Sequence, residues 1–181
     1  MAKQKEKKVA REIEVIVESD GHVTRHATED QWDRDDTSTS HYVRGIRVLK
    51  EGEYSRYGRS VPVDFEPKPG EAYTVVCAQY STGDSFGHDD GQGFEVVGVY
   101  RNRKVADENV ARIEKHYDID RRLERSYPPM AAKERKELMK KHNSFSVDLK
   151  TDDGRVHQIH VPWTGYFESL DWVRAETFTL S

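Results

Sequence analysis

Apolar and polar residues alternate over short stretches in the first part of the chain, a pattern typical of strands with one buried face. The alternation is clear over residues 12–18 and 42–49, and apolar runs follow at 61–65, 72–78 and 94–100. The sequence Ser-Asp-Gly-His at residues 19–22 predicts a turn, followed by a weaker strand at 23–28. Pro62 favours an edge position for its strand, because proline cannot donate a ladder hydrogen bond. The sequence Pro-Lys-Pro-Gly at residues 67–70 predicts a turn before the run at 72–78.

Helical spacing appears only after residue 100. Ala106, Val110, Ile113 and Tyr117 are three or four residues apart, which predicts one apolar face of a helix that covers the sheet. Asn102 is the candidate N-cap of this helix. A second helix is predicted to begin near Pro129, and its thin apolar stripe indicates a peripheral, solvated element.

The remaining sequence returns to strand patterns. Residues 145–150 and 156–161 flank an Asp-Gly step that predicts a hairpin, and residues 171–180 form a last strand. Strands, then helices, then strands predict an α+β fold, with a mainly antiparallel sheet, one packed helix and one peripheral basic helix. We expect a solvated N-terminal tail over residues 1–11 and a single domain over 12–181. A mobile acidic loop at 29–41 and a helical insertion at 118–143 are expected within that domain.

Composition limits the partners. Apolar residues make up 35% and charged residues 34% of the 181-residue chain, which indicates a modest core under a heavily solvated surface. The net charge is −4, although residues 101–142 carry thirteen basic and eight acidic side chains. The overall negative charge argues against general nucleic-acid binding. With no apolar stretch near the ~20 residues of a membrane span, we expect a cytoplasmic protein without a membrane partner.

The most informative polar segment is residues 80–93, which separates two apolar runs and is longer than a turn requires. Its four glycines and its hydroxyl and carboxylate side chains can present backbone N–H groups to a small anionic or hydroxylated ligand. We also expect Gly83 and Gly87 to supply left-handed geometry or close ligand approach. The alternative is a structural loop held by its own side chains. As a ligand loop it has these candidate binding residues: Ser81, Thr82, Gly83, Asp84, Ser85, Phe86 and Gly87.

An aromatic segment near the end of the chain is the second candidate. Trp163, Tyr166 and Phe167 lie within five residues and are either core side chains or a wall on which a nucleobase stacks. Arg101 or Arg103 would balance the charge of a phosphate in such a site. Together these residues predict a pocket with a flat face and polar anchors.

Metal and catalytic patterns are weak in this sequence. The adjacent His88, Asp89 and Asp90 rarely point at one ion, and His157 and His160 fall on opposite faces of an ideal strand. The lone Cys77 lies in an apolar run, which predicts a core residue. We therefore assign no catalytic residue, no metal and no cofactor from the sequence, and turnover of a ligand stays open.

Two motifs carry a resemblance to other proteins. Tyr80–Gly87 after a strand and the late segment Pro162–Leu170 together resemble a group of small phage-encoded proteins of unassigned function, over roughly residues 60–181. The resemblance implies a viral protein acting in the cytoplasm of a host bacterium. Small phage proteins with a binding pocket and no catalytic set include host-takeover factors and sponges that sequester the nucleotide signals of bacterial immunity.

The sequence thus predicts a homo-oligomeric binding protein that captures a small nucleotide-like ligand without hydrolysing it. Two other functions stay open at this point. One is a protein-directed inhibitor whose acidic residues 29–36 engage a basic host surface, and the other is a phosphoesterase that uses some of the eight histidines.

Overall fold

The computed structural model describes residues 11–24, 36–49, 58–83, 89–125, 128–163 and 168–181. They form an α+β fold of eight strands and two helices, as the order of sequence patterns predicts. The elements in chain order are β1 (Arg11–Thr24), β2 (Asp36–Val48), β3 (Gly58–Val63), β4 (Ala72–Gly83), β5 (Asp89–Tyr100), α1 (Arg103–Arg125), α2 (Ala132–Lys141), β6 (Ser146–Lys150), β7 (Val156–His160) and β8 (Ser169–Thr179).

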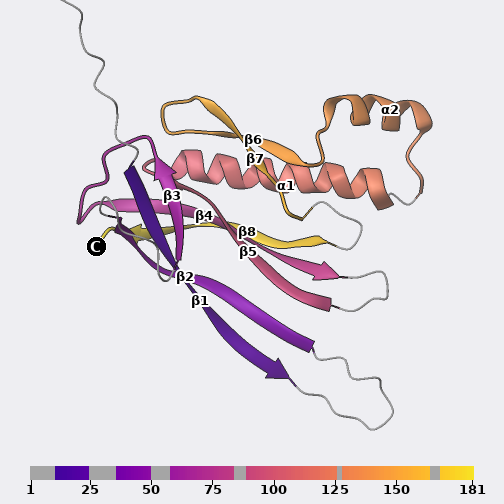
Figure 1. Cartoon of the computed structure of the whole chain (residues 1–181). Coiled ribbons are helices and arrows are strands. Elements are labelled where there is room, and N and C mark those ends of the chain that lie inside the picture. The colour runs from indigo at the N-terminus through magenta and orange to yellow at the C-terminus, as the bar shows by residue number, and fades with distance from the viewer. Residues whose placement is uncertain (1–10, 25–35, 50–57, 84–88, 126–127, 164–167) are drawn as a thin grey trace, which may run out of the picture.

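The described strands pair antiparallel in three groups. The first sheet has the order β2-β1-β3, the second sheet has the order β5-β4-β8, and β6 pairs with β7 in a separate hairpin. In Figure 1 β1 and β2 extend below the second sheet, and α1 runs between the second sheet and the hairpin. β3 lies at an edge of its sheet, which confirms the prediction made from Pro62.

Two hydrophobic cores share the second sheet. Alternate residues of β4 point to opposite faces, so Val75 and Cys77 join the first core, between the sheets, while Val76 and Ala78 join the second, beneath α1. Cys77 is fully buried, and this burial raises the pKa of its thiol to about 12, as expected of an unreactive core residue. The second core also contains Ala106 and Ile113 of α1, which confirms the predicted packed helix.

The structure confirms the predicted N-cap and the predicted character of the two helices, but not the predicted boundary between them. The Asn102 Oδ1 accepts a hydrogen bond from the Lys104 backbone N–H at 3.0 Å, as an N-cap does. α1 continues to Arg125, so the predicted insertion boundary at residue 118 falls inside this helix. α2 has no buried residue and is the peripheral basic helix that the sequence predicts. Neither described helix is long and apolar enough to cross a membrane.

Two predictions about the N-terminal region are wrong. β1 continues through the expected turn at residues 19–22, where Ser19 pairs with His41 and Gly21 with Thr39. The expected loop at 29–41 contains the start of β2 at Asp36, while residues 29–35 lie outside the described part of the chain. Both errors have one cause: pairing between distant segments satisfies the backbone of residues that locally favour a turn or a loop.

The predicted loop at 80–93 is also shorter than expected. β4 extends to Gly83 and β5 begins at Asp89, with an irregular register at Thr82/Gly83. Residues 84–88 lie outside the described residues. In contrast, the turns predicted at Gly70 and Gly154 are confirmed by positive φ angles of 83° and 82°.

Candidate functional site

The glycine-rich residues proposed for ligand binding end β4. Ser81 donates from Oγ to Asp171 Oδ1 at 2.8 Å, which ties this segment to β8. Gly83 pairs with Asp89 and is not among the described glycines with positive φ, so the expected left-handed geometry is not found there. Asp84, Ser85, Phe86 and Gly87 lie outside the described residues.

The two candidate arginines lie far from this segment. β5 runs from Asp89, opposite Gly83, to Tyr100, opposite Thr74, and a strand of that length separates its ends by about 35 Å at ~3.3 Å per residue. Arg101 and Arg103 follow its far end. The Arg101 guanidinium lies 5.7 Å from the centre of the Phe65 ring, and Arg103 pairs with Asp107 at 2.8 Å. The structure therefore does not bring these arginines to the glycine-rich segment.

The aromatic segment does approach the glycine-rich segment, but from the interior. The Trp163 ring lies 6.1 Å from the ring of Tyr80, centre to centre, and only 1% of Trp163 is exposed. Trp163 is thus a member of the second core, with no ring face open to a ligand. Tyr166 and Phe167 lie outside the described residues.

A cavity of about 350 Å³ opens elsewhere, between β3, β5 and the β6–β7 hairpin. Its walls are largely aliphatic and include Val61, Val63, Val96, Val99 and Ile159. We call this space the valine cavity. Its volume lies within the ~300–1,000 Å³ range of small-ligand pockets.

The topology explains why a space remains there. β3 and β5 are edge strands of different sheets, and consecutive residues of each strand line the cavity. Val76 pairs with Gly98 while Cys77 pairs with Val96, so Val97 is the extra residue of a β-bulge within the lining. The hairpin covers this gap with Arg155, His157 and Ile159, which alternate along one face.

Two polar atoms among the lining residues lack a hydrogen bond of normal geometry within the described chain: Tyr100 Oη and His157 Nδ1. Burial raises the pKa of Tyr100 to about 12, against a smaller lowering by the nearby Asn109 side chain. The Tyr100 hydroxyl therefore keeps its proton at physiological pH and can donate it. A Cβ on Gly98 would lie 2.8 Å from this oxygen, so glycine leaves the hydroxyl its space.

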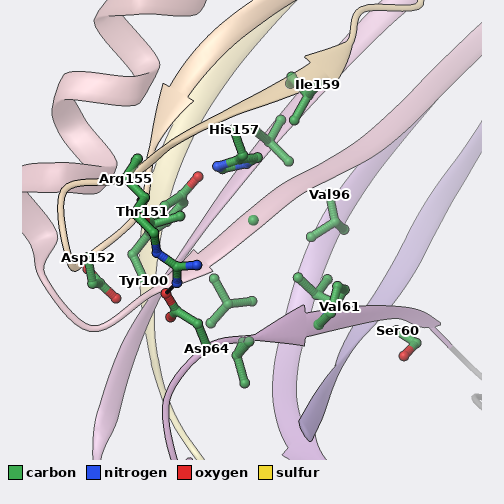
Figure 2. A pocket seen from close by; sticks show the side chains of 15 residues that line it. Ser60, Val61, Asp64, Val96, Tyr100, Thr151, Asp152, Arg155, His157 and Ile159 are labelled. Atoms are coloured by element: carbon green, nitrogen blue, oxygen red, sulfur yellow. Dashed lines mark hydrogen bonds and ion pairs between the residues drawn. The ribbon is translucent and has the colours of Figure 1, made fainter. Parts of the chain in front are cut away.

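The rim of the valine cavity is charged. In Figure 2 the Arg155 side chain reaches from the hairpin to Asp64 just after β3, and its Nη2 lies 2.7 Å from Asp64 Oδ2. Arg155 Nε also contacts Asp153 at 2.7 Å. Asp152 accepts the backbone N–H groups of Arg101 and Asn102 at 2.7 and 3.1 Å. Two carboxylates pair with the Arg155 guanidinium and Asp152 is a further carboxylate of the lining, so the rim is acidic.

Comparison with protein-family models, with curated proteins and with solved structures found no match to this chain. The function is therefore argued from the site itself. Within the described residues, no group of three histidine, cysteine or carboxylate side chains is arranged to hold a metal ion.

The sequence contained only part of the signal for the valine cavity. The hairpin that carries Arg155 and His157 is predicted from its Asp-Gly step, and the structure confirms that His157 is half-buried while His160 is exposed on the opposite face. Nothing in the local pattern of Val61 or Asp64 indicates that β3 meets β5 and β7. The alternation of residues 156–160 places His157 on the same face of the hairpin as Ile159, and this pattern could have identified His157 as a candidate binding residue.

Proposed function

We propose that this protein binds a small molecule with a flat, hydrogen-bonding ring of the nucleobase type, and that the ligand lies in the valine cavity. The observation that carries the proposal is the combination of aliphatic walls with two buried polar atoms that lack a hydrogen bond of normal geometry within the described chain, Tyr100 Oη and His157 Nδ1. Aliphatic walls accept the faces of a planar ring, while a hydroxyl donor and an imidazole can read its edge.

The charge of the rim indicates how such a ligand would be oriented. Arg155 is already paired with Asp64 and Asp153, and Asp152 adds a further carboxylate. Like charges repel, so a phosphate would be disfavoured inside this rim. We propose that the uncharged ring enters the cavity and that any phosphate of a nucleotide remains in solvent.

We further propose capture without hydrolysis. Among the described residues, no hydrogen bond joins the hydroxyl of Tyr100 or Thr151 to His157, and Thr151 Oγ1 instead contacts Asp153 and the Arg155 carbonyl. A nucleophile within hydrogen-bond reach of its base is the arrangement expected of a covalent hydrolase. Sequestration of a nucleotide-derived immune signal by a homo-oligomeric phage protein stays a prediction that rests on the two sequence motifs.

The test compares two histidines of one strand. Nucleosides, cyclic oligonucleotides and ADP-ribose derivatives are screened for a rise in melting temperature, and hits are titrated by calorimetry. We expect His157→Ala to weaken binding about tenfold or more, because a hydrogen bond to a buried group is lost. His160→Ala, on the opposite face of β7, should bind as the parent does.

Two further measurements complete this test. Tyr100→Phe removes only the hydroxyl and should weaken binding with little change in melting temperature, since that oxygen has no partner of normal geometry in the described chain. Chromatography of the ligand released by denaturation should return it unchanged. The proposal fails if no compound of these classes raises the melting temperature, or if His160→Ala weakens binding as much as His157→Ala does.

A further inference from the structure

A second cavity, of about 530 Å³, follows one face of α1 beside β6. β7 lines the valine cavity, whereas β6 lines this one. The side chains that matter here are Arg112, Lys115, His116, His142, Glu108 and Asp148. We call this space the helix groove. The inference drawn from this groove does not depend on the function proposed above.

Two cations in the helix groove have no counter-ion among the described residues. Arg112 is half-buried and Lys115 is exposed, and at a spacing of three residues they are neighbours on the surface of α1. Neither side chain makes a hydrogen bond or ion pair with any described residue, and both line the groove. A partly buried guanidinium without an acceptor is costly, so an anion in the groove would stabilise it.

The carboxylates of the helix groove are already engaged. Lys150 Nζ lies 3.3 Å from Glu108 Oε2, and Gln158 Nε2 donates to Asp148 Oδ1 at 3.2 Å. Glu108 is neutralised within the fold, and Asp148 is held toward β7. Asp148 keeps its negative charge, because the amide of Gln158 is neutral, so Arg112, Lys115 and Asp148 together leave one net positive charge in the groove.

The adjoining part of the groove is formed by two rigid imidazoles. The rings of His116 and His142 lie 4.5 Å apart, centre to centre. His142 Nε2 lies 3.1 Å from Asp120 Oδ1, and His116 Nε2 lies 2.7 Å from the Asn143 carbonyl oxygen. These contacts fix both rings before any ligand arrives, which lowers the entropic cost of binding beside them.

We propose that the helix groove binds a phosphate monoester group. The planar guanidinium of Arg112 can donate two parallel N–H bonds to a phosphate, and Lys115 adds a point charge. A monoester, whose charge is close to −2 at neutral pH, is attracted to Arg112 and Lys115 more strongly than a diester with its single charge. The chemical class is thus a small molecule or a terminus that carries a free phosphate.

The test uses phenyl phosphate as the monoester and dimethyl phosphate as the diester, with binding followed by the NMR shifts of the Arg112 guanidinium and the two imidazoles. Arg112→Gln should weaken monoester binding about tenfold or more, since hydrogen bonds to charged groups are strong. Arg112→Lys keeps the positive charge but loses the planar pair of N–H donors, so its affinity for the monoester should lie between those of the parent and Arg112→Gln. Lys115→Gln should weaken binding about threefold to tenfold.

Lys104→Gln is the matched control, because it removes one positive charge from an exposed position two turns earlier in α1. It should change the affinity less than about twofold, since screening weakens charges beyond a Debye length of ~8–10 Å. The proposal is wrong if phenyl phosphate leaves the groove resonances unmoved, or if Lys104→Gln weakens binding as much as Arg112→Gln. Equal affinity for dimethyl phosphate would overturn the choice of a monoester.

Discussion

The burial of Trp163 decides whether this side chain of the aromatic segment belongs to the core or to a wall on which a nucleobase stacks. It is 1% exposed and packs in the second core against Tyr80, so its indole stabilises the fold rather than stacking on a ligand. We expect Trp163→Ala to lower the free energy of unfolding by about 3–5 kcal/mol, as large-to-small core substitutions do. Trp163→Phe should cost less, because the indole N–H has no partner among the described residues. Urea denaturation of both variants measures this, and a Trp163→Ala protein as stable as the parent would contradict it.

Gly58 is a residue fixed by close approach of two backbones. A Cβ at this position would lie 2.0 Å from the Val15 carbonyl oxygen, and a backbone atom cannot move aside as a side-chain end can. We expect Gly58→Ala to loosen the pairing of β3 with β1 and to destabilise the protein by about 1–3 kcal/mol. Gly45→Ala is the control, since a Cβ there meets nothing within 4 Å. If the two variants lowered the melting temperature equally, the close approach of Gly58 to the Val15 backbone would not be what requires glycine there.

At the scale of elements, buried histidines join α2 to α1. His142, the C-cap of α2, contacts Asp120 of α1, and its ring lies 4.5 Å from the ring of His116 at an interplanar angle of 41°. Burial lowers the pKa of His116 below its usual 6.5, and the nearby His142 lowers it further, while the Asn143 backbone opposes the shift. A histidine with a lowered folded pKa binds fewer protons folded than unfolded, so its contribution to stability is lost as pH falls below 6.5 toward the folded pKa.

We therefore expect the free energy of unfolding to decrease between pH 7 and pH 5, and His116→Gln to flatten this decrease. His41, whose pKa burial also lowers, contributes in the same direction and should keep part of the slope in the variant. Denaturation at a series of pH values gives the slopes. An unchanged slope in His116→Gln would mean that this ring does not govern the acid response of the α1–α2 junction.

At the scale of the whole molecule, the two cores are coupled because β4 contributes residues to both. We expect the described domain to unfold in one cooperative transition, since neither core can lose β4 alone. Trp163 packs in the second core and Trp172 against the first, so fluorescence can follow each core separately. In a Trp32→Phe background, Trp163→Phe and Trp172→Phe each leave one probe. For each variant, the unfolding midpoint measured by fluorescence of the remaining tryptophan should coincide with the unfolding midpoint measured by far-ultraviolet circular dichroism. Different midpoints would show that the two cores unfold independently.

The sequence itself determined those parts of the fold that depend on neighbouring residues. Gly70 and Gly154 adopt positive φ in turns predicted from local chemistry, Asn102 caps α1 as its side chain allows, and Pro62 lies in an edge strand. The α+β class follows from the same short-range signals, because the change from two-residue to helical spacing is visible in the chain.

Only the tertiary structure decided where distant segments pair and which surfaces meet. Residues 19–22 read locally as a turn, yet pairing with β2 keeps them extended, and the polar residues 36–41 form a strand for the same reason. Arg101 and Trp163 each look suited to a ligand site in the sequence, but one follows the far end of β5 and the other lies in the second core. The valine cavity exists because β3, β5 and β7, far apart in the chain, come together with two edge strands that do not pair. The arrangement of these three strands is determined by long-range packing, which a local sequence pattern does not predict.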